Sequence, residues 1–299
     1  MSEHGTIAII AERRHLDNVS IRTAHESFEA AGFEVHLVVP DAVRLFNVPL
    51  ERPPWRAVLS RGRDLTGLAL LAAAAALGVP AINTPQAIEL VRNKIAMQSV
   101  LLQYHVTVPR TWFAADPAAF RDVPAAQFPL VVKPYDGDGA RGLWLLTEPD
   151  DAGRLPQLAE GRSIFLAQTL LDSDGWDVKL YAIGSRVWAV RKPSPVKFAG
   201  AGPAEVRSTD GAEMIDLDST LRDIAMTCGR ACGLDLWGVD VAITADGPVV
   251  IEVNDFPTYS AVPEAGALIA EHVISLIEIE TVLRDNGRVR ALSVIRSPR

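Results

Sequence analysis

The stretch LWGVDVAITADGPVVIEVN (residues 236–254) decides the fold, because it contains two apolar runs around a short polar turn. The runs cover residues 236–243 and 249–253, and each alternates between apolar and polar or small side chains. Between them lies Ala245-Asp246-Gly247, a combination typical of tight turns between antiparallel strands. The sequence therefore predicts a β-hairpin.

The register of this hairpin determines which side chains share a face. A two-residue loop would place Asp240 opposite Val253 and turn its carboxylate away from Glu252 and Asn254. We expect instead a three-residue loop with Gly247 in the left-handed conformation, which pairs Asp240 directly with Glu252 and keeps Asn254 on the same face. The opposite face then carries the apolar set, Val239, Val241, Ile243, Val249, Ile251 and Val253.

The polar face of the hairpin has the chemistry of a metal site. Two carboxylates directly opposite each other repel by up to about 1 kcal/mol in water, and by more in a drier cleft. A hard cation would offset this repulsion, and Mg²⁺ prefers oxygen ligands of this kind. The residues predict a magnesium site formed by Asp240, Glu252 and Asn254, the alternative being an acidic face that is simply solvated.

A second motif lies about 100 residues earlier. The apolar run 128–133 predicts a strand that ends in Lys133 and leads into a glycine-rich loop, residues 136–142, which includes Asp136, Gly137 and Gly139. Glycines allow backbone N–H groups to approach phosphate oxygens closely. A strand, a lysine and such a loop in this order indicate a phosphate site, although the loop alone could be an ordinary hairpin turn.

The residues before this strand predict a helix and a separate sheet. Thr84-Pro85 gives a hydroxyl N-cap followed by proline at the first helical position, and Lys94, which follows in the same region, would by itself be a solvated lysine. Short apolar runs alternate with helical segments from residue 6 to about residue 83, which predicts a parallel sheet. Its first strand is followed by Glu12-Arg13-Arg14-His15, so the glycine fingerprint for dinucleotides is missing.

Composition limits the classes of function. The chain has 299 residues, 48% of them apolar, and a formal charge of −8 without a basic run, which argues against a sequence-independent nucleic-acid site. Its most apolar stretch, residues 67–77, is shorter than the roughly 20 residues needed to span a bilayer. No signal peptide is evident, so we expect no membrane partner and a cytoplasmic location. Cys228 and Cys232 are expected to be buried thiols.

The order of these motifs resembles the ATP-grasp superfamily, and within it the RimK-like carboxylate–amine ligases, over almost the whole chain. The resemblance implies an α/β and α+β fold, in which a Rossmann-like parallel sheet (residues 1–90) precedes two α+β lobes that clasp ATP (residues 91–175 and 176–299). The residues that carry the resemblance are Arg92-Asn93-Lys94, the strand 128–133 with its loop, Gln168, Asp177-Val178-Lys179, Gly238-Val239-Asp240 and Glu252-Val253-Asn254.

Roles for individual residues follow from the resemblance alone. It implies that Lys94, Lys133 and the glycine loop bind the ATP phosphates, and that Asp240, Glu252 and Asn254 bind two Mg²⁺ ions, for which Mn²⁺ could substitute. Adenine would contact the hinge formed by Gln168, Thr169 and Leu170, and the ribose would contact Asp177. The expected catalytic cations are Lys179, Arg191 and Lys192. The expected substrate ligands are Arg61, Arg63, Ser194 and Lys197.

The implied reaction is ADP-forming ligation of a carboxylate to an amine through an acyl phosphate, on a small molecule or a peptide. The chain departs from the family pattern at Lys179, where many relatives have arginine, which leaves the acceptor open. Local similarity around residues 191–198 and 254–259 to inositol polyphosphate kinases supports an alternative, transfer of phosphate to a hydroxyl. The apolar helices of the first layer could also support a homodimer.

Overall fold

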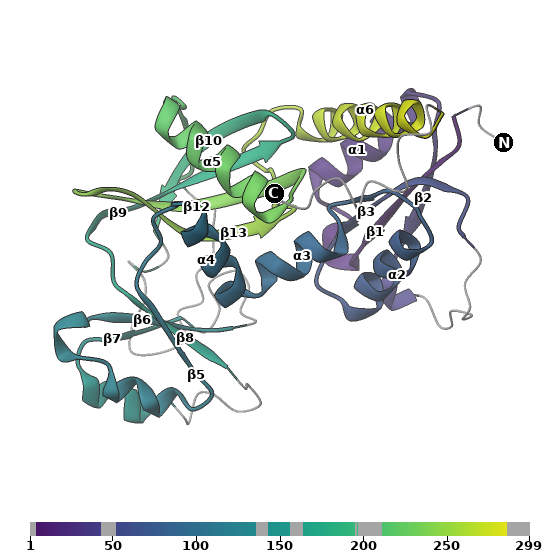
Figure 1. The fold of residues 1–299 in the computed structure, drawn as a ribbon. Coiled ribbons are helices and arrows are strands. Elements are labelled where there is room, and N and C mark those ends of the chain that lie inside the picture. Colours follow the sequence, from purple (N-terminus) through teal and green to yellow (C-terminus); the bar gives the residue numbers. More distant parts are fainter. Residues whose placement is uncertain are drawn as a thin grey trace.

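The computed structural model describes residues 4–42, 52–135, 143–155, 164–194, 196 and 211–285. They form three sheets of four, four and five strands. Figure 1 shows the parallel layer on one side of the molecule and the two antiparallel sheets, one above the other, on the opposite side. Helix α3 runs between the two sides. No helix within these described ranges is both long and apolar enough to cross a membrane.

The N-terminal layer is a parallel sheet in the order β2-β1-β3-β4. Helices α1 and α6 cover one face and α2 covers the other, so both faces are buried, as expected for a parallel sheet. Asn18 caps α1 and Asp64 caps α2 through their side-chain oxygens. The elements are β1 Thr6–Ala11, α1 Val19–Ala30, β2 Glu34–Val38, β3 Trp55–Arg61, α2 Leu65–Ala76, β4 Ala81–Ile82 and α6 Ala265–Asp285.

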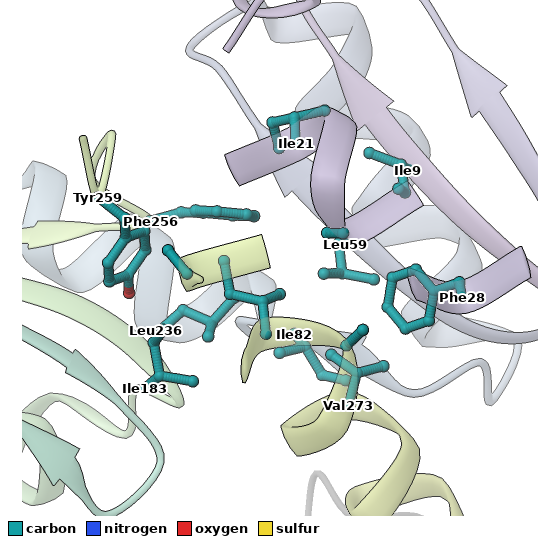
Figure 2. Close-up of a cluster of buried hydrophobic side chains, with 14 of the residues drawn as sticks. Ile9, Ile21, Phe28, Leu59, Ile82, Ile183, Leu236, Phe256, Tyr259 and Val273 are labelled. Carbon is teal, nitrogen blue, oxygen red and sulfur yellow. The ribbon is translucent and has the colours of Figure 1, made fainter. Parts of the chain in front are cut away.

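One hydrophobic core joins this layer to the rest of the chain. It combines side chains of β1, β3 and α1 with residues from the C-terminal part, including Tyr259 and Val273, and Figure 2 shows the cluster extending continuously between the two parts. Asn83, which is buried, adds a polar connection. Its amide donates to the carbonyl of Leu236 at 2.7 Å and accepts from the N–H groups of Asp235 and Leu236. The N-terminal layer is therefore fixed against the first residue of β12.

The smaller antiparallel sheet has the order β5-β8-β6-β7 and its own core around Phe120 and Phe165. It is preceded by α3 (Pro85–Arg92), whose first turn is capped by Thr84 as the sequence predicts, and by α4 (Lys94–Gln103). Two 3-10 segments, Pro117–Asp122 and Pro149–Arg154, contribute to the core. The strands are β5 Thr111–Ala114, β6 Leu130–Pro134, β7 Trp144–Leu146 and β8 Phe165–Thr169.

The larger antiparallel sheet has the order β11-β10-β9-β12-β13. Helices α3, α4 and α5 pack on one face, where α5 begins at the N-cap Asp218 and ends at Gly233, a left-handed residue. One part of the opposite face joins the core shared with the N-terminal layer, and another part carries polar side chains that line a cleft together with residues of the smaller sheet. The elements are β9 Ser173–Ile183, β10 Arg186–Pro193, β11 Glu213–Ile215, α5 Ser219–Cys232, β12 Leu236–Thr244 and β13 Gly247–Asp255.

The hairpin β12–β13 confirms the expected pairing of Asp240 with Glu252, but by a different route. The expected three-residue loop is wrong, because Thr244 pairs with Gly247 and only two residues lie between them. A bulge at Ile251 supplies the extra residue instead.

The bulge also changes which apolar side chains enter the core. Beyond it the alternation is inverted, so Val250 joins Val239, Val241 and Val253 in the core while Ile251 lines the cleft. Ile243 is 41% exposed. The predicted apolar face is therefore wrong at Ile251 and at Val249, which pairs with the cleft-lining Ala242 and is absent from this core, although Asp240, Glu252 and Asn254 do share the polar face.

Candidate functional site

A cleft of about 1030 Å³ lies where the three sheets meet. Its lining residues come from all three parts: the ends of β1 and β3, strands β6 and β8 of the smaller sheet, and the polar face of β9, β10, β12 and β13. Most of the predicted site residues that the structure describes fall in this one space, although their sequence positions range from 61 to 254.

Asp240 lies at the centre of the polar face. Its carboxylate accepts from Lys179 Nζ at 3.0 Å, pairs with Lys192 Nζ at 3.1 Å, and accepts from Asn254 Nδ2 at 2.9 Å. Burial raises the pKa of Asp240, but the two ammonium groups outweigh it and hold the pKa well below its usual range. Asp240 is therefore ionised, and the three groups around it all donate to it.

Glu252 has a similar environment. Lys94 Nζ lies 2.9 Å from Oε1, and Lys133 Nζ lies 3.8 Å from Oε2. Burial lowers the pKa of Lys133, while Lys94 and Lys133 lower the pKa of Glu252 despite its burial. Four lysine ammonium groups therefore offset the repulsion between the two facing carboxylates. The argument that a metal is needed to offset the repulsion between the carboxylates is therefore wrong, because the lysines already offset it.

Asp177 lies on the same face of β9 as Lys179. Burial raises its pKa to about 6, even though Ser194 donates a hydrogen bond to it and Lys192 and Lys179 are near. Its side chain and that of Ser194 line the cleft. Both residues are thus placed together at the β9–β10 side of the site.

One end of the cleft is mostly apolar. Val131, Leu143, Leu145 and Ile251 line it close to the expected hinge. The hinge residues Gln168, Thr169 and Leu170 also line it, and the side chain of Gln168 donates to the hydroxyl of Thr111 at 3.2 Å.

Several polar atoms of the hinge already make hydrogen bonds within the protein. The backbone N–H groups of Thr169 and Leu170 donate to the carbonyls of Arg110 and Pro129, at 3.1 and 2.9 Å. The hydroxyl oxygen of Thr169 is buried and has no hydrogen-bond partner among the described residues. An apolar wall with a few polar atoms beside it is typical of small-molecule sites.

The other end is lined with arginines. Arg61 donates to the carbonyl of Phe256 and lies 5.8 Å from the centre of its ring. Arg92 makes two hydrogen bonds to Asp255, at 2.7 and 3.1 Å, and one to the carbonyl of Gly62 at 2.6 Å. These contacts tie the ends of β3 and β13 to each other. Arg63 lines the cleft beside them, as predicted.

Arg14 and His15 also line this end, and the sequence reasoning missed them. Both follow β1, at the same edge of the sheet as Arg61, the last residue of β3. The signal was present, because parallel strands deliver the residues after their carboxyl ends to one edge. The motif Glu12-Arg13-Arg14-His15 was used only to exclude a dinucleotide fingerprint.

Arg191 is the predicted site residue that the structure does not bring to the cleft. It lies on the opposite face of β10 from Lys192, pairs with Asp174 at 2.6 Å and lies 4.7 Å from the ring centre of Trp176. Of the two candidate cations, strand alternation therefore leaves Lys192 at the cleft. Asp136, Gly137, Gly139 and Lys197 lie outside the described residues.

The donor set fits a divalent cation and a phosphate chain together. The described residues contain no group of three His, Cys, Asp or Glu side chains suited to hold a metal by themselves. Two carboxylates with an amide oxygen provide a partial set, which suits Mg²⁺ because it keeps waters and takes phosphate oxygens as its other ligands. The lysines provide the cations that phosphates require.

Two antiparallel sheets that enclose such a cleft, beside a parallel N-terminal layer, define an ATP-grasp fold. Residues 91–277 match the family model of the RimK-like ATP-grasp domain. The chain therefore belongs to the RimK-like ATP-grasp family, a family of carboxylate–amine ligases.

Individual proteins are similar to this chain over most of its length. A probable alpha-L-glutamate ligase 1 of Shewanella frigidimarina is 27% identical over 91% of this chain and 95% of its own length. The crystal structure of D-cycloserine synthetase DcsG has a TM-score of 0.74 at 20% identity, over 91% of this chain and all of that one. The ATP-grasp ligase PsnB, complexed with a minimal precursor, Mg and ADP, has a TM-score of 0.67 at 19% identity, over 91% and 98%.

Proposed function

We propose that this chain is an ADP-forming ligase that activates a carboxylic acid with ATP as an acyl phosphate and joins it to an amine. The observation that carries the proposal is the convergence in one cleft of the Asp240–Glu252 pair with four buried or half-buried lysines. A site that only bound a nucleotide would not need paired carboxylates opposite phosphate-binding cations.

The nucleotide is proposed to lie along the cleft from the hinge to the polar sheet. Adenine would stack on Val131 and Leu143 beside Gln168, Thr169 and Leu170, where the Thr169 hydroxyl offers an unused polar atom. Because the N–H groups of Thr169 and Leu170 are used in the fold, the adenine contacts would come from other atoms of this segment.

Asp177, Lys94 and Lys133 would hold the rest of the nucleotide. Asp177 is proposed to contact the ribose, and Lys94 and Lys133 the phosphates. The proposed phosphate contacts of Asp136, Gly137 and Gly139 fall outside the described residues.

Asp240, Glu252 and Asn254 are proposed to hold one or two Mg²⁺ ions, and Mn²⁺ could take the same oxygen ligands. When bound, the metal neutralises charge on the transferring phosphoryl group. The lysines that now pair with the carboxylates would then turn to phosphate oxygens, since both are anions within reach of a flexible side chain. Lys179 and Lys192, which flank Asp240, are proposed to hold the transferring group.

The chemistry then follows in two displacements. A carboxylate oxygen of the acid attacks the γ-phosphorus, the bond to the bridging oxygen breaks, and ADP leaves. The amine attacks the acyl carbon, and phosphate leaves with the oxygen that came from the acid. Arg61, Arg63 and Ser194 line the cleft where the acid would lie and are proposed to orient it; Lys197, proposed for the same role, lies outside the described residues.

The names of similar proteins support two classes of substrate. A glutamate ligase and a D-cycloserine synthetase support small molecules, and PsnB with its precursor supports a peptide. We propose an amino acid or peptide as one of the two substrates. The kinase alternative has no corresponding support, because the family model and these three proteins all belong to ligases or synthetases.

The test is ADP release from ATP and Mg²⁺ with pools of acids, amines and polyol phosphates. A ligase releases ADP only with an acid, faster when an amine is present, and hydroxylamine in place of the amine gives a hydroxamate. ADP release with a polyol phosphate alone, and no hydroxamate from any acid, would overturn the proposal.

A further inference from the structure

A row of four side chains crosses the smaller antiparallel sheet on the face toward the cleft. Leu145 of β7 pairs with Val131 of β6, which pairs with Gln168 of β8 on its other side. Gln168 in turn pairs with Thr111 of β5. Directly paired residues of antiparallel strands project from the same face. Leu145, Val131 and Gln168 line the cleft, whereas Thr111 does not, so the row begins in the apolar wall of the cleft and ends beside it.

The hydroxyl proton of Thr111 is already engaged. Its Oγ1 donates to the carbonyl of Pro109 at 2.9 Å. A hydroxyl carries a single proton to donate and two lone pairs that accept, so Oγ1 can only accept from any further partner. That partner is Gln168, whose amide nitrogen Nε2 lies 3.2 Å away and donates to it.

These two hydrogen bonds set the orientation of the Gln168 amide. The nitrogen must face Thr111, because the opposite orientation would place the amide oxygen against an oxygen that has no proton left to donate. The amide oxygen Oε1 then turns away from β5, to the side on which Val131 lines the cleft. The carbonyl of Pro109 thus determines, through Thr111, that the amide offers the cleft an acceptor and not a donor.

Burial gives the orientation of this amide its importance. Gln168 is 4% exposed, so a ligand in the cleft shields its oxygen from water. A buried acceptor without a donor costs free energy, and a ligand that supplies a donor avoids this cost. The site therefore favours a base with an N–H group at this edge and disfavours a base with an oxygen there.

We propose that Thr111 is a positioning residue that selects the base of the nucleotide, because it holds the Gln168 oxygen as an acceptor for the 6-amino group of a purine and so excludes 6-oxo purines. The inference rests on the proposed function for the location of the base beside Val131 and Gln168. Adenine has an amino group at C6, which donates. Hypoxanthine and guanine have an oxygen there, which would face Oε1 as a second acceptor. Thr111 acts through Gln168, since it does not itself line the cleft.

The test compares ADP with IDP, whose base has a 6-oxo group in place of the 6-amino group and a protonated N1. Titration calorimetry on the full chain with Mg²⁺ measures Kd for each nucleotide, and the ratio of the two Kd values is the readout. The wild type is expected to bind ADP at least about tenfold more tightly than IDP, since a hydrogen-bonded donor is replaced by an opposed acceptor. A general loss of stability would not change this ratio.

Two substitutions of Thr111 separate the effect of its hydroxyl from that of its shape. Thr111→Val keeps the shape but lets the Gln168 amide rotate, so the preference for ADP should fall at least about fivefold, in part because IDP binds more tightly. Thr111→Ser keeps the hydroxyl and should retain the ratio of the wild type. If Thr111→Val fails to fold, Thr111→Ala removes the hydroxyl without adding a methyl group and should give the same fall.

Thr244→Val is the matched control. Thr244 is also partly buried, and its hydroxyl also donates to a main-chain carbonyl, that of Gly247 at 2.8 Å. It lies at the turn of the β12–β13 hairpin and does not line the cleft. The variant loses the same kind of hydrogen bond and should keep the ratio of the wild type.

A double-mutant cycle tests whether Thr111 acts through Gln168. Gln168→Leu removes the acceptor and should lower the preference for ADP by itself. Adding Thr111→Val to Gln168→Leu should then change the ratio no further, because the group that Thr111 orients is gone. A further fall in the double variant would contradict the route through Gln168.

Three other results would overturn the inference. They are a wild type without a preference for ADP, a ratio for Thr111→Val equal to that of the wild type, and a ratio for Thr111→Ser as low as that of Thr111→Val. Acid-dependent ADP release from ATP can persist in each case, and the ligase proposal then stands. Conversely, hydroxyl-dependent selection of ADP without acid-dependent ADP release leaves the base selection and removes the ligase. Failure to bind either nucleotide would remove both proposals.

Discussion

The two ends of the polar cleft hold their charges in different ways. On the large sheet, lysines pair with carboxylates through single ammonium groups, as in Lys94–Glu252 and Lys179–Asp240. At the edge of the parallel layer, arginines are tied to the backbone, as Arg92 is to the carbonyl of Gly62 and Arg61 to that of Phe256. The lysines thus form ion pairs with side-chain carboxylates, whereas Arg61 and Arg92 also donate to main-chain carbonyls.

This difference indicates that the two ends are suited to different tasks. A lysine on a flexible stem can leave a carboxylate for a phosphate oxygen with little change in the backbone, whereas a guanidinium held by several hydrogen bonds keeps its position. The lysine end suits a group whose charge changes during a reaction. The arginine end suits recognition of a fixed anion, and also holds the two parts of the molecule together.

The largest expected effect comes from Glu252→Gln at the lysine end. The amide keeps the shape but removes the charge that faces Lys94 and Lys133, and with it one of the proposed metal ligands. Turnover should fall by about 10² to 10³. Steady-state ADP release under saturating Mg²⁺ measures it, with the exposed Glu271→Gln as the matched carboxylate control. Near-normal turnover of Glu252→Gln would remove the metal role.

The arginine end should show its largest effect in stability. Arg92→Gln breaks an ion pair whose two side chains are each less than one-fifth exposed, and it leaves Asp255 without its cation. The loss in free energy of unfolding should be about 2 to 3 kcal/mol, somewhat below that of a fully buried pair. Urea unfolding measures it. A loss under about 0.5 kcal/mol would mean that Arg92 does not hold the two parts together.

Asp177 allows a pH test between the two ends. Its folded-state pKa of about 6 exceeds the ordinary value of 3.8, so the folded state holds the proton more tightly. Its ionisation therefore costs stability as pH rises from about 4 through 6, and Asp177→Asn removes a cost of about 3 kcal/mol. The variant should unfold at higher temperature than the wild type at about pH 8 and at a similar one at about pH 4. The same difference in melting temperature between variant and wild type at both pH values would contradict the burial argument.

The smallest effect is expected on the far surface. Arg186 makes two hydrogen bonds to Glu271, at 2.6 and 2.9 Å, yet both side chains are about half exposed or more. Arg186→Gln should change the free energy of unfolding by about 0.5 kcal/mol or less. If the change in free energy of unfolding equalled that of Arg92→Gln in the same urea titration, burial would not explain the difference between the two arginine–carboxylate pairs.

The residue pattern predicted the pairing of Asp240 with Glu252 in the central hairpin, because only this register places the polar side chains together on one face. The bulge at Ile251 could not be predicted, since a bulge and a longer turn shift the register by the same single residue. The choice between Arg191 and Lys192 was likewise open, because it depends on the register of β9 with β10 rather than on either residue.

The electrostatics were harder to predict than the topology. The sequence showed four lysines and two carboxylates as separate motifs, and only the structure shows that they form ion pairs with each other. Arg14 was missed for a different reason. Arg14 is hydrogen-bonded to Glu12, which also accepts from the N–H groups of Arg63 and Asp64, and this contact between residues about 50 positions apart is one that no local pattern reveals.

The central claim is that an oxygen of the acid attacks the γ-phosphorus of ATP. Acid substrate labelled with heavy oxygen in its carboxylate tests this directly, by the isotope shift of the released phosphate in phosphorus NMR. We predict that each turnover transfers one labelled oxygen to phosphate. Unlabelled phosphate, released while the amide product forms, would contradict the account.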